Sequence, residues 1–371
     1  MTLQKLWFAD DGYKKLEEYM HVCSVKRVMI VHGASYNKLR ISKVFGDIIA
    51  RNEIQVVHFT EFSPNPDVAS VLLGVRLLQK EKPDFLMAVG GGSALDVAKC
   101  IKLYGKADTG VGLLSQKNVC EDVPFAVLPT TAGTGSETTR FAVIYENGEK
   151  QSVTSQKFIP DIVLFDSSVL EFLPMNQRKA TFLDALSHAV ESYWSVNASE
   201  VSRAYAEEAI RLLMANTEYI DSPEMFERYD ILQYAAYLAG KAINISQTTA
   251  GHAMCYKLTS IFGISHGQAA ALCMTRLWRY MESVESVKGI LNELSRCMGY
   301  VHSSEAILKL EDMLKRWDMA KPLKTEEETD YMVILNLLSD SVNPTRLKNH
   351  PVQLSKEIFR ELYRKILTGV F

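Results

Sequence analysis

Short apolar runs alternate with helical patterns along the first half of the chain, and this alternation constrains the fold more than any other feature. Four runs rich in β-branched and other apolar residues lie at 27–31 (RVMIV), 55–59 (QVVHF), 85–89 (FLMAV) and 125–129 (FAVLP). Between the second and third runs, residues 68–82 place apolar side chains at helical spacing, as a crossover helix requires. The alternation predicts βαβ units and a parallel sheet between residue 26 and about residue 170.

The pattern changes after Pro174. From there on, apolar residues recur every three or four positions and strand-like runs vanish. A chain of 371 residues also exceeds the size at which one hydrophobic core stays efficient. We therefore expect an α/β N-terminal domain with a Rossmann-like parallel sheet over residues 1–172, and an all-α C-terminal domain over residues 173–371. Within the first domain, Asn147-Gly148 predicts the tight turn of a β-hairpin.

Composition and charge exclude several classes of protein. The hydrophobic fraction of 47% and the charged fraction of 23% are typical of a globular protein, and a net charge of −3 gives no long-range field for nucleic acid or anionic lipid. No stretch approaches the ~20 apolar residues of a membrane span, and the N-terminus lacks the pattern of a signal peptide. We expect a cytoplasmic protein that binds neither nucleic acid nor membranes, with six reduced cysteines.

A glycine-rich turn follows the third strand-like run. Gly90, Gly91 and Gly92 come directly after it, and residues 93–99 open a helix. Glycines let backbone N–H groups face an anion at a helix N-terminus, which already favours negative charge. The turn thus has the form of a diphosphate site. Alternatively, it only reverses the chain, with Ser93 and Asp96 as a capping pair.

A second polar loop, residues 128–138 (LPTTAGTGSET), follows the fourth strand-like run. The hydroxyls of Thr130, Thr131, Thr134 and Ser136 surround two glycines and suit phosphate and ribose oxygens. The alternative is an ordinary polar loop. Neither segment matches the Walker pattern or the spaced G-x-G-x-x-G motif. The two loops together predict a variant of the dinucleotide-binding design.

The helical half carries a set of metal-ligand residues. Asp184 and His188 are four residues apart and project from one face of a helix. His252 and His266 are separated by a break at residues 262–264 that lets the chain turn. One carboxylate and three imidazoles suit Fe²⁺ or Zn²⁺. Each residue alone is more often a packed or capping side chain, and we assign no role to the other histidines, at positions 21, 32, 58, 302 and 350.

At these motifs the chain resembles the iron-containing, or type III, alcohol dehydrogenase family over nearly its whole length. The shared motifs are GGGSALDVAK, PTTAGTGSE, DALSHAVE and the GHA…HG segment. The resemblance implies Fe²⁺ or Zn²⁺ held by Asp184, His188, His252 and His266, and a homo-oligomer, a dimer or larger. It also implies a nicotinamide cofactor at the two glycine-containing loops. The expected cofactor residues are Gly90, Gly91, Gly92, Ser93, Asp96, Thr130, Thr131, Thr134, Ser136 and Lys150.

Two positions depart from the family pattern. Many members have a second histidine four residues after the first ligand of the GHA segment, where this chain has Tyr256. Tyr256 is our candidate catalytic residue, although tyrosine is a poor base at neutral pH. NAD-preferring members often have an acidic residue after the first strand, where this chain has Gly33, with Ser35 close by. Because no carboxylate repels a 2′-phosphate there, NADPH is favoured over NADH.

Within the family, the sequence looks most like the phosphonoacetaldehyde reductase branch. The cationic side chains that would bind a phosphonate are Arg140, Lys257, Arg276 and Arg279, unless these are ordinary surface charges. The predicted reaction is metal-dependent hydride transfer between NAD(P)H and a small aldehyde or alcohol. The alternatives are a reductase of another short-chain aldehyde, a metal- and NAD-dependent lyase like 3-dehydroquinate synthase, and a non-catalytic binding protein.

Overall fold

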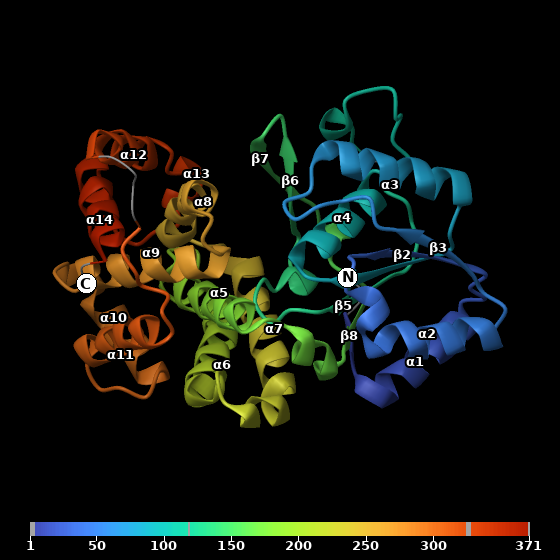
Figure 1. Cartoon of the computed structure of the whole chain (residues 1–371), viewed down its shortest axis with the longest axis horizontal. Helices are drawn as coiled ribbons and strands as arrows, with labels where there is room; N and C mark the ends of the chain where they lie inside the picture. Colours follow the sequence, from blue (N-terminus) through green and yellow to red (C-terminus); the bar gives the residue numbers. More distant parts are fainter. Residues whose placement is uncertain (1–3, 118, 324–327, 370–371) are drawn as a thin grey trace. The chain divides into compact units, whose positions relative to one another are not determined.

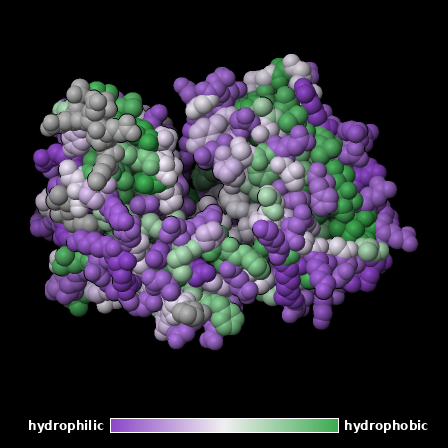
Figure 2. Space-filling view, in the orientation of Figure 1, coloured by the Kyte–Doolittle hydropathy of each residue, from purple (hydrophilic) through white to green (hydrophobic). Residues whose placement is uncertain are grey.

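The computed structural model describes residues 4–117, 119–323 and 328–369. The chain divides into two compact units, Met1–Leu173 and Pro174–Phe371. In the described residues no helix is long and apolar enough to cross a membrane. On the face shown in Figure 2, hydrophilic side chains cover most of the surface, with smaller hydrophobic areas between them.

A parallel six-stranded sheet forms the centre of the described part of unit 1 (Figure 1). Its strands pair in the order β1-β8-β5-β4-β2-β3, and every pair is parallel. The strands predicted at 27–31, 55–59, 85–89 and 125–129 are confirmed. The sheet strands are β1 (Lys5–Phe8), β2 (Arg27–His32), β3 (Gln55–Phe59), β4 (Phe85–Gly90), β5 (Phe125–Pro129) and β8 (Ile162–Phe165).

The sequence analysis missed β1 and β8, which pair with each other. Each has only four residues, too few to show a period, and a short apolar run does not distinguish a strand from a buried loop. The parallel partner decides between these two possibilities. The partner of β1 lies more than 150 positions away in the sequence, and the second partner of β8 is β5, so no local pattern can reveal either pairing.

The strand order creates a switch point between β2 and β4. From β2 the chain moves to one side to form β3, and then crosses to the other side to form β4 and β5. In open parallel sheets, ligands bind at the carboxyl ends of the strands on either side of such a point. Gly33 follows β2, and the glycine-rich turn follows β4. Their strand ends are adjacent because His32 pairs with Val89.

Helices cover both faces of the sheet. Figure 1 shows α3 and α4 on one side and α1 and α2 on the other, so the central strands are buried on both faces. The crossover helix predicted at 68–82 is confirmed as α3. The helices are α1 (Ala9–Val22), α2 (Arg40–Arg51), α3 (Val68–Glu81) and α4 (Gly92–Leu103).

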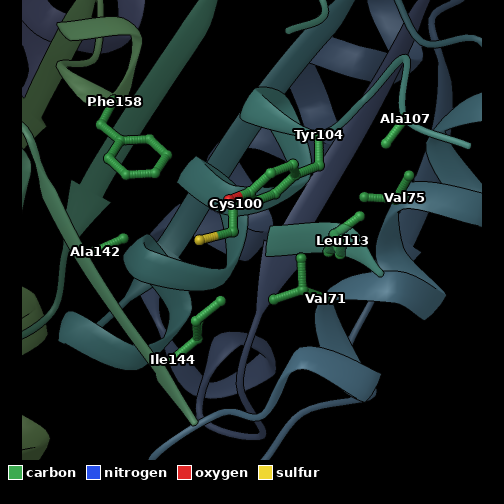
Figure 3. Close-up of a cluster of buried hydrophobic side chains, with 9 residues drawn as sticks. All are labelled: Val71, Val75, Cys100, Tyr104, Ala107, Leu113, Ala142, Ile144 and Phe158. Atoms are coloured by element: carbon green, nitrogen blue, oxygen red, sulfur yellow. The ribbon is translucent and has the colours of Figure 1, made fainter. Parts of the chain in front are cut away.

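The predicted β-hairpin is confirmed as β6 (Phe141–Glu146) and β7 (Glu149–Thr154). Asn147 and Gly148 both have positive φ, 52° and 77°, as the tight turn requires. A hydrophobic cluster packs the hairpin against α3 and α4 (Figure 3). Its members are Val71, Val75, Cys100, Tyr104, Ala107, Leu113, Ala142, Ile144 and Phe158. Their burial fixes the hairpin beside the helix that begins at the glycine-rich turn.

The described residues of unit 2 form helices and no strand. Helix α5 is buried along most of its length, from Phe182 to Trp194, and packs against α6, α7 and α9. The metal-ligand candidates of this helix therefore lie in the interior. The helices are α5 (Met175–Trp194), α6 (Glu200–Asn216), α7 (Tyr229–Ser246), α8 (Ala250–Phe262), α9 (His266–Met281), α10 (Lys288–Cys297), α11 (Ser303–Arg316), α12 (Glu328–Asp340), α13 (Pro344–Leu347) and α14 (Lys356–Thr368).

The start of α3 offers a test of the fold. The Asp67 carboxylate accepts hydrogen bonds from the backbone N and Oγ of Ser70, at 2.8 and 2.7 Å. Asp67→Ala should destabilise this helix start by about 1 kcal/mol. The first α3 amides should then exchange their hydrogens about five times faster. Asp67→Asn should keep most of the protection, because asparagine caps equally well. Equal exchange in both variants would contradict the assignment.

Candidate active site

The two loops predicted to bind a dinucleotide lie against each other in unit 1. Gly91 is the N-cap of α4 and has no side-chain cap. A Cβ added to Gly91 would lie 3.2 Å from Thr131 Cγ2, and one added to Gly92 would lie 3.1 Å from Thr134 Cγ2. The Thr130 N–H donates to the Gly90 carbonyl at 2.9 Å. The helix N-terminus and the threonine hydroxyls thus share one site with donors suited to a diphosphate.

Asp96 and Ser136, both expected to contact the cofactor, form a hydrogen bond with each other. Ser136 Oγ donates to Asp96 Oδ1 at 2.7 Å and accepts from Lys99 Nζ at 2.8 Å. The other Asp96 oxygen accepts from the Val143 N–H at 2.9 Å. These bonds connect α4 to the threonine-rich loop and to β6, so the two side chains shape the site. Asp96 does not cap the helix.

Lys99 is a residue that the sequence analysis missed. Its ammonium group is fully buried and also donates to the Thr139 carbonyl and the Phe141 carbonyl, at 3.1 and 2.9 Å. Burial lowers the pKa of Lys99 to about 8, against the opposing effect of the Asp96 charge. Its spacing of three from Asp96 on one helix was the available signal. Nothing in the sequence indicated that the side chain points inward.

Three further cofactor candidates lie in unit 1. Gly33 has open space where a Cβ would be, and Ser35 is exposed. Lys150 is on β7, and its positive charge opposes the effect of burial on the pKa of Asp96. Lys150 is therefore close to Asp96 of α4. Gly33 follows β2, the strand that pairs with β4.

In unit 2 the four predicted metal ligands come together from three helices. Asp184 and His188 are on α5, His252 is on α8, and His266 is the first residue of α9. Asp184 Oδ1 lies 3.6, 3.8 and 3.9 Å from Nε2 of His252, His266 and His188, respectively. The His188 and His252 rings stack with centroids 4.5 Å apart.

The donor set fits a divalent cation. Asp184 Oδ1 and His252 Nε2 are buried, face each other and have no hydrogen-bond partner among the described residues. This arrangement is costly unless a cation lies between them. Ligand atoms about 2.1 Å from one tetrahedral ion are about 3.4 Å apart. The ligand atoms of Asp184, His252 and His266 all lie within 4.8 Å of one another, and His188 Nε2 lies 3.9 Å from Asp184 Oδ1. Burial would raise the pKa of Asp184, but the positive charges of His188 and His266 and contacts with His252 lower it. Fe²⁺ and Zn²⁺ both accept this set of ligands.

Two glycines make the close approach of these helices possible. A Cβ on Gly267 would lie 1.8 Å from the Ala180 carbonyl oxygen of α5. A Cβ on Gly251 would lie 2.4 Å from Glu191 Oε1. Each glycine directly adjoins a histidine ligand. The GHA and HG motifs therefore encode the packing of α8 and α9 on α5 as well as the ligands, which the sequence analysis did not recognise.

Glu191 is a second residue that the sequence analysis missed. Its Oε1 lies 2.6 Å from His252 Nδ1, opposite the nitrogen that faces Asp184. Burial alone would raise the pKa of Glu191, but the positive charge of His252 and hydrogen bonds from His252 and Thr249 lower it to about 2. Glu191 closes the DALSHAVE motif, three residues after His188. That spacing on the ligand face of the helix was the available signal.

Tyr256, the catalytic candidate, lies beside His266, one of the four predicted metal ligands. Its half-buried ring stacks on His266, with centroids 5.7 Å apart and planes within 12°. Lys257 is exposed on the same helix. Arg276 and Arg279 follow His266 by ten and thirteen residues on α9, a rise of about 15 to 20 Å. Arg279 also binds Glu311, at 2.7 Å. These two arginines are too far from His266 to bind a two-carbon substrate at the metal ligands.

Family models match both units. Residues 4–167 match the model described as iron-containing alcohol dehydrogenase, and residues 179–367 match that of the C-terminal part of the Fe-containing alcohol dehydrogenase family. The chain belongs to the iron-containing alcohol dehydrogenase family. It is thus an oxidoreductase that acts on alcohols, which argues against the lyase and non-catalytic alternatives.

Named relatives cover nearly the whole chain. Long-chain-alcohol dehydrogenase 1 of Geobacillus thermodenitrificans is 30% identical over 86% of this chain and 84% of its own length. Alcohol dehydrogenase 4 of Saccharomyces cerevisiae is 26% identical, covering 95% and 94%. The structure of sulfoacetaldehyde reductase from Bifidobacterium kashiwanohense in complex with NAD⁺ has a TM-score of 0.87 at 25% identity, covering 99% and 98%. These similarities support the α/β plus all-α fold of this family member.

The glycine beside His266 gives a direct test of the helix packing. Gly267→Ala should push α9 away from α5 and displace His266, because the added methyl group overlaps the Ala180 carbonyl. We expect loss of bound metal, measured by elemental analysis of purified protein. The matched control is Gly289→Ala on α10, where a Cβ meets no atom within 4 Å and metal content should stay unchanged. Full metal content in Gly267→Ala would contradict the described packing.

Proposed function

We propose that this oxidoreductase works as an aldehyde reductase, using NADH or NADPH and a divalent metal ion, Fe²⁺ or Zn²⁺. The observation that carries the proposal is the convergence of buried Asp184, His188 and His252 with the half-buried His266. Within the part of the chain that the structure describes, Asp184 Oδ1 and His252 Nε2 face each other without a hydrogen-bond partner. The overall reaction is aldehyde plus NAD(P)H plus a proton, giving the alcohol and NAD(P)⁺. The same residues would serve the reverse oxidation.

The chain's own residues would bind and orient the reactants. A metal ion held by Asp184, His188, His252 and His266 would supply a Lewis acid that polarises the aldehyde carbonyl. The Tyr256 hydroxyl, beside His266, would pass the proton that the alcohol oxygen needs, either its own or one from water. The helix α4 N-terminus and the hydroxyls of the threonine-rich loop would hold the cofactor diphosphate.

For the substrate we propose a small aldehyde with an anionic group, and phosphonoacetaldehyde as the specific compound, giving 2-hydroxyethylphosphonate. Two observations support this choice: the resemblance to the phosphonoacetaldehyde reductase branch, and the similarity to a protein named sulfoacetaldehyde reductase. The cationic partner in unit 2 would be Lys257, since Arg276 and Arg279 lie far along α9. A neutral short-chain aldehyde is the second candidate, favoured by the relatives named as alcohol dehydrogenases.

A substrate panel tests the proposal. The purified protein is assayed for NADH and NADPH oxidation with phosphonoacetaldehyde, sulfoacetaldehyde and propanal, before and after metal removal. We expect turnover to vanish on chelation and return with Fe²⁺ or Zn²⁺. We also expect kcat/KM for phosphonoacetaldehyde to exceed that for propanal about tenfold, because charge-assisted hydrogen bonds to the phosphonate, which propanal cannot form, would contribute about 1.4 kcal/mol. Full turnover without metal would refute the role of the ligands, and equal values for both aldehydes would refute the anionic substrate.

The nucleotide preference is tested at Gly33. We propose that the chain accepts NADPH because no carboxylate lies at residues 33–39, directly after β2. Gly33→Asp fits without overlap, since a Cβ there meets no atom within 4 Å. The new charge should lower kcat/KM with NADPH about tenfold or more by repelling the 2′-phosphate, and leave NADH turnover intact. Gly33→Asn is the matched uncharged control. Equal effects of both variants on NADPH would contradict the assignment of Gly33 to the ribose site.

A further inference from the structure

We propose that Glu191 is a positioning residue of the metal centre. It fixes the tautomer of His252 and, after Asp184, supplies a second negative charge next to the metal site. This inference rests on the proposed function, since it concerns the same metal site. It adds a residue outside the four expected ligands and assigns it a separate role. Three sets of contacts in unit 2 support it.

The Glu191 carboxylate is completely buried and lies among converging donors. Its Oε1 accepts from His252 Nδ1 at 2.6 Å, and its Oε2 accepts from the Thr249 N–H and Oγ1, both at 2.7 Å. Trp194 Nε1 donates to Thr249 Oγ1 at 2.9 Å. Because Oγ1 already accepts from the indole, its own hydrogen is free to point at Glu191. A chain of bonds therefore runs from Trp194 through Thr249 and Glu191 to His252.

This chain of bonds determines which His252 nitrogen faces the metal site. An ionised carboxylate can only accept hydrogen bonds, so Nδ1 of His252 must carry the proton. The Nε2 lone pair is then available on the side of Asp184, 3.6 Å from its Oδ1. Carboxylates in this position orient the ring and increase the basicity of the ligand nitrogen. Removal of the carboxylate would leave both the ring orientation and the tautomer undetermined.

The charges of the site also require Glu191. Asp184 is 4% exposed and is the sole carboxylate among the four expected ligands, so these ligands would offset only one of the two charges of a divalent ion. The Glu191 charge would offset the other. Gly251 keeps the necessary space open, since a Cβ at that position would lie 2.4 Å from Glu191 Oε1. The helix that carries His252 is thus shaped to receive this carboxylate.

The test is a Co²⁺ titration of metal-stripped full-length protein, followed through the visible ligand-field bands of the bound ion. Glu191→Gln keeps the side-chain size but removes the charge, and its amide must turn an N–H toward either His252 Nδ1 or the Thr249 donors. We expect about 10- to 100-fold weaker Co²⁺ binding and altered bands. The matched control is Glu311→Gln, which neutralises another buried carboxylate of unit 2, paired with Arg279. It should bind Co²⁺ like the wild type.

A second pair of variants keeps the proposal testable if Glu191→Gln does not fold. Thr249→Val removes one donor to Glu191 without changing the side-chain shape, and should weaken Co²⁺ binding several-fold. Thr249→Ser retains the hydroxyl and should not. Wild-type affinity and bands in Glu191→Gln, or in Thr249→Val if that is the folded variant, would overturn the positioning role, as would an equal loss in Glu311→Gln. If the wild type itself takes up no Co²⁺, the proposed function fails first, which distinguishes the two failures.

Discussion

The structure of unit 2 depends on one buried carboxylate, Asp184, which lies among three imidazoles contributed by two further helices and its own. A carboxylate at this depth is unfavourable unless positive charge is close. A cation held between Asp184 Oδ1 and the Nε2 atoms of His252, His266 and His188, which all lie within 4 Å of that oxygen, would supply that charge. That requirement fixes how closely α8 and α9 approach α5. It also explains two glycines, at 251 and 267, whose role is to leave room for the neighbouring helix. Ligand chemistry and helix packing are therefore encoded in the same short motifs.

In unit 1 the candidate site favours a ligand of the opposite charge, an anion. It presents backbone N–H groups and hydroxyls at the start of α4, and places a buried ammonium, Lys99, beneath the loop that carries the hydroxyls. The positive charge and the helix N-terminus both favour an anion at this end of the sheet. A chain with a net charge of −3 can in this way offer a local site for a diphosphate.

The sequence predicted most of the fold, because the main strands and helices carry strong local periods. The spacing and side-chain types of Asp184, His188, His252 and His266 also pointed to a shared site, and the structure brings them together, while their role as metal ligands stays a prediction. Prediction from the sequence failed where the deciding contact is distant in sequence. Strands β1 and β8 are four residues each and depend on one another across more than 150 positions. Glu191 and Lys99 resemble ordinary helix residues until the fold turns them inward against His252 and Ser136. The need for glycine at positions 251 and 267 becomes apparent only when the facing helix α5 is in place.

The central claim is that Asp184 and the three histidines bind one divalent cation. Anomalous diffraction from crystals of metal-loaded protein, collected at the absorption edge of the bound metal, tests it most directly. The account predicts one strong peak about 2.0 to 2.2 Å from Asp184 Oδ1 and from Nε2 of His188, His252 and His266. A peak coordinated by other side chains, with no density among these four, would contradict it.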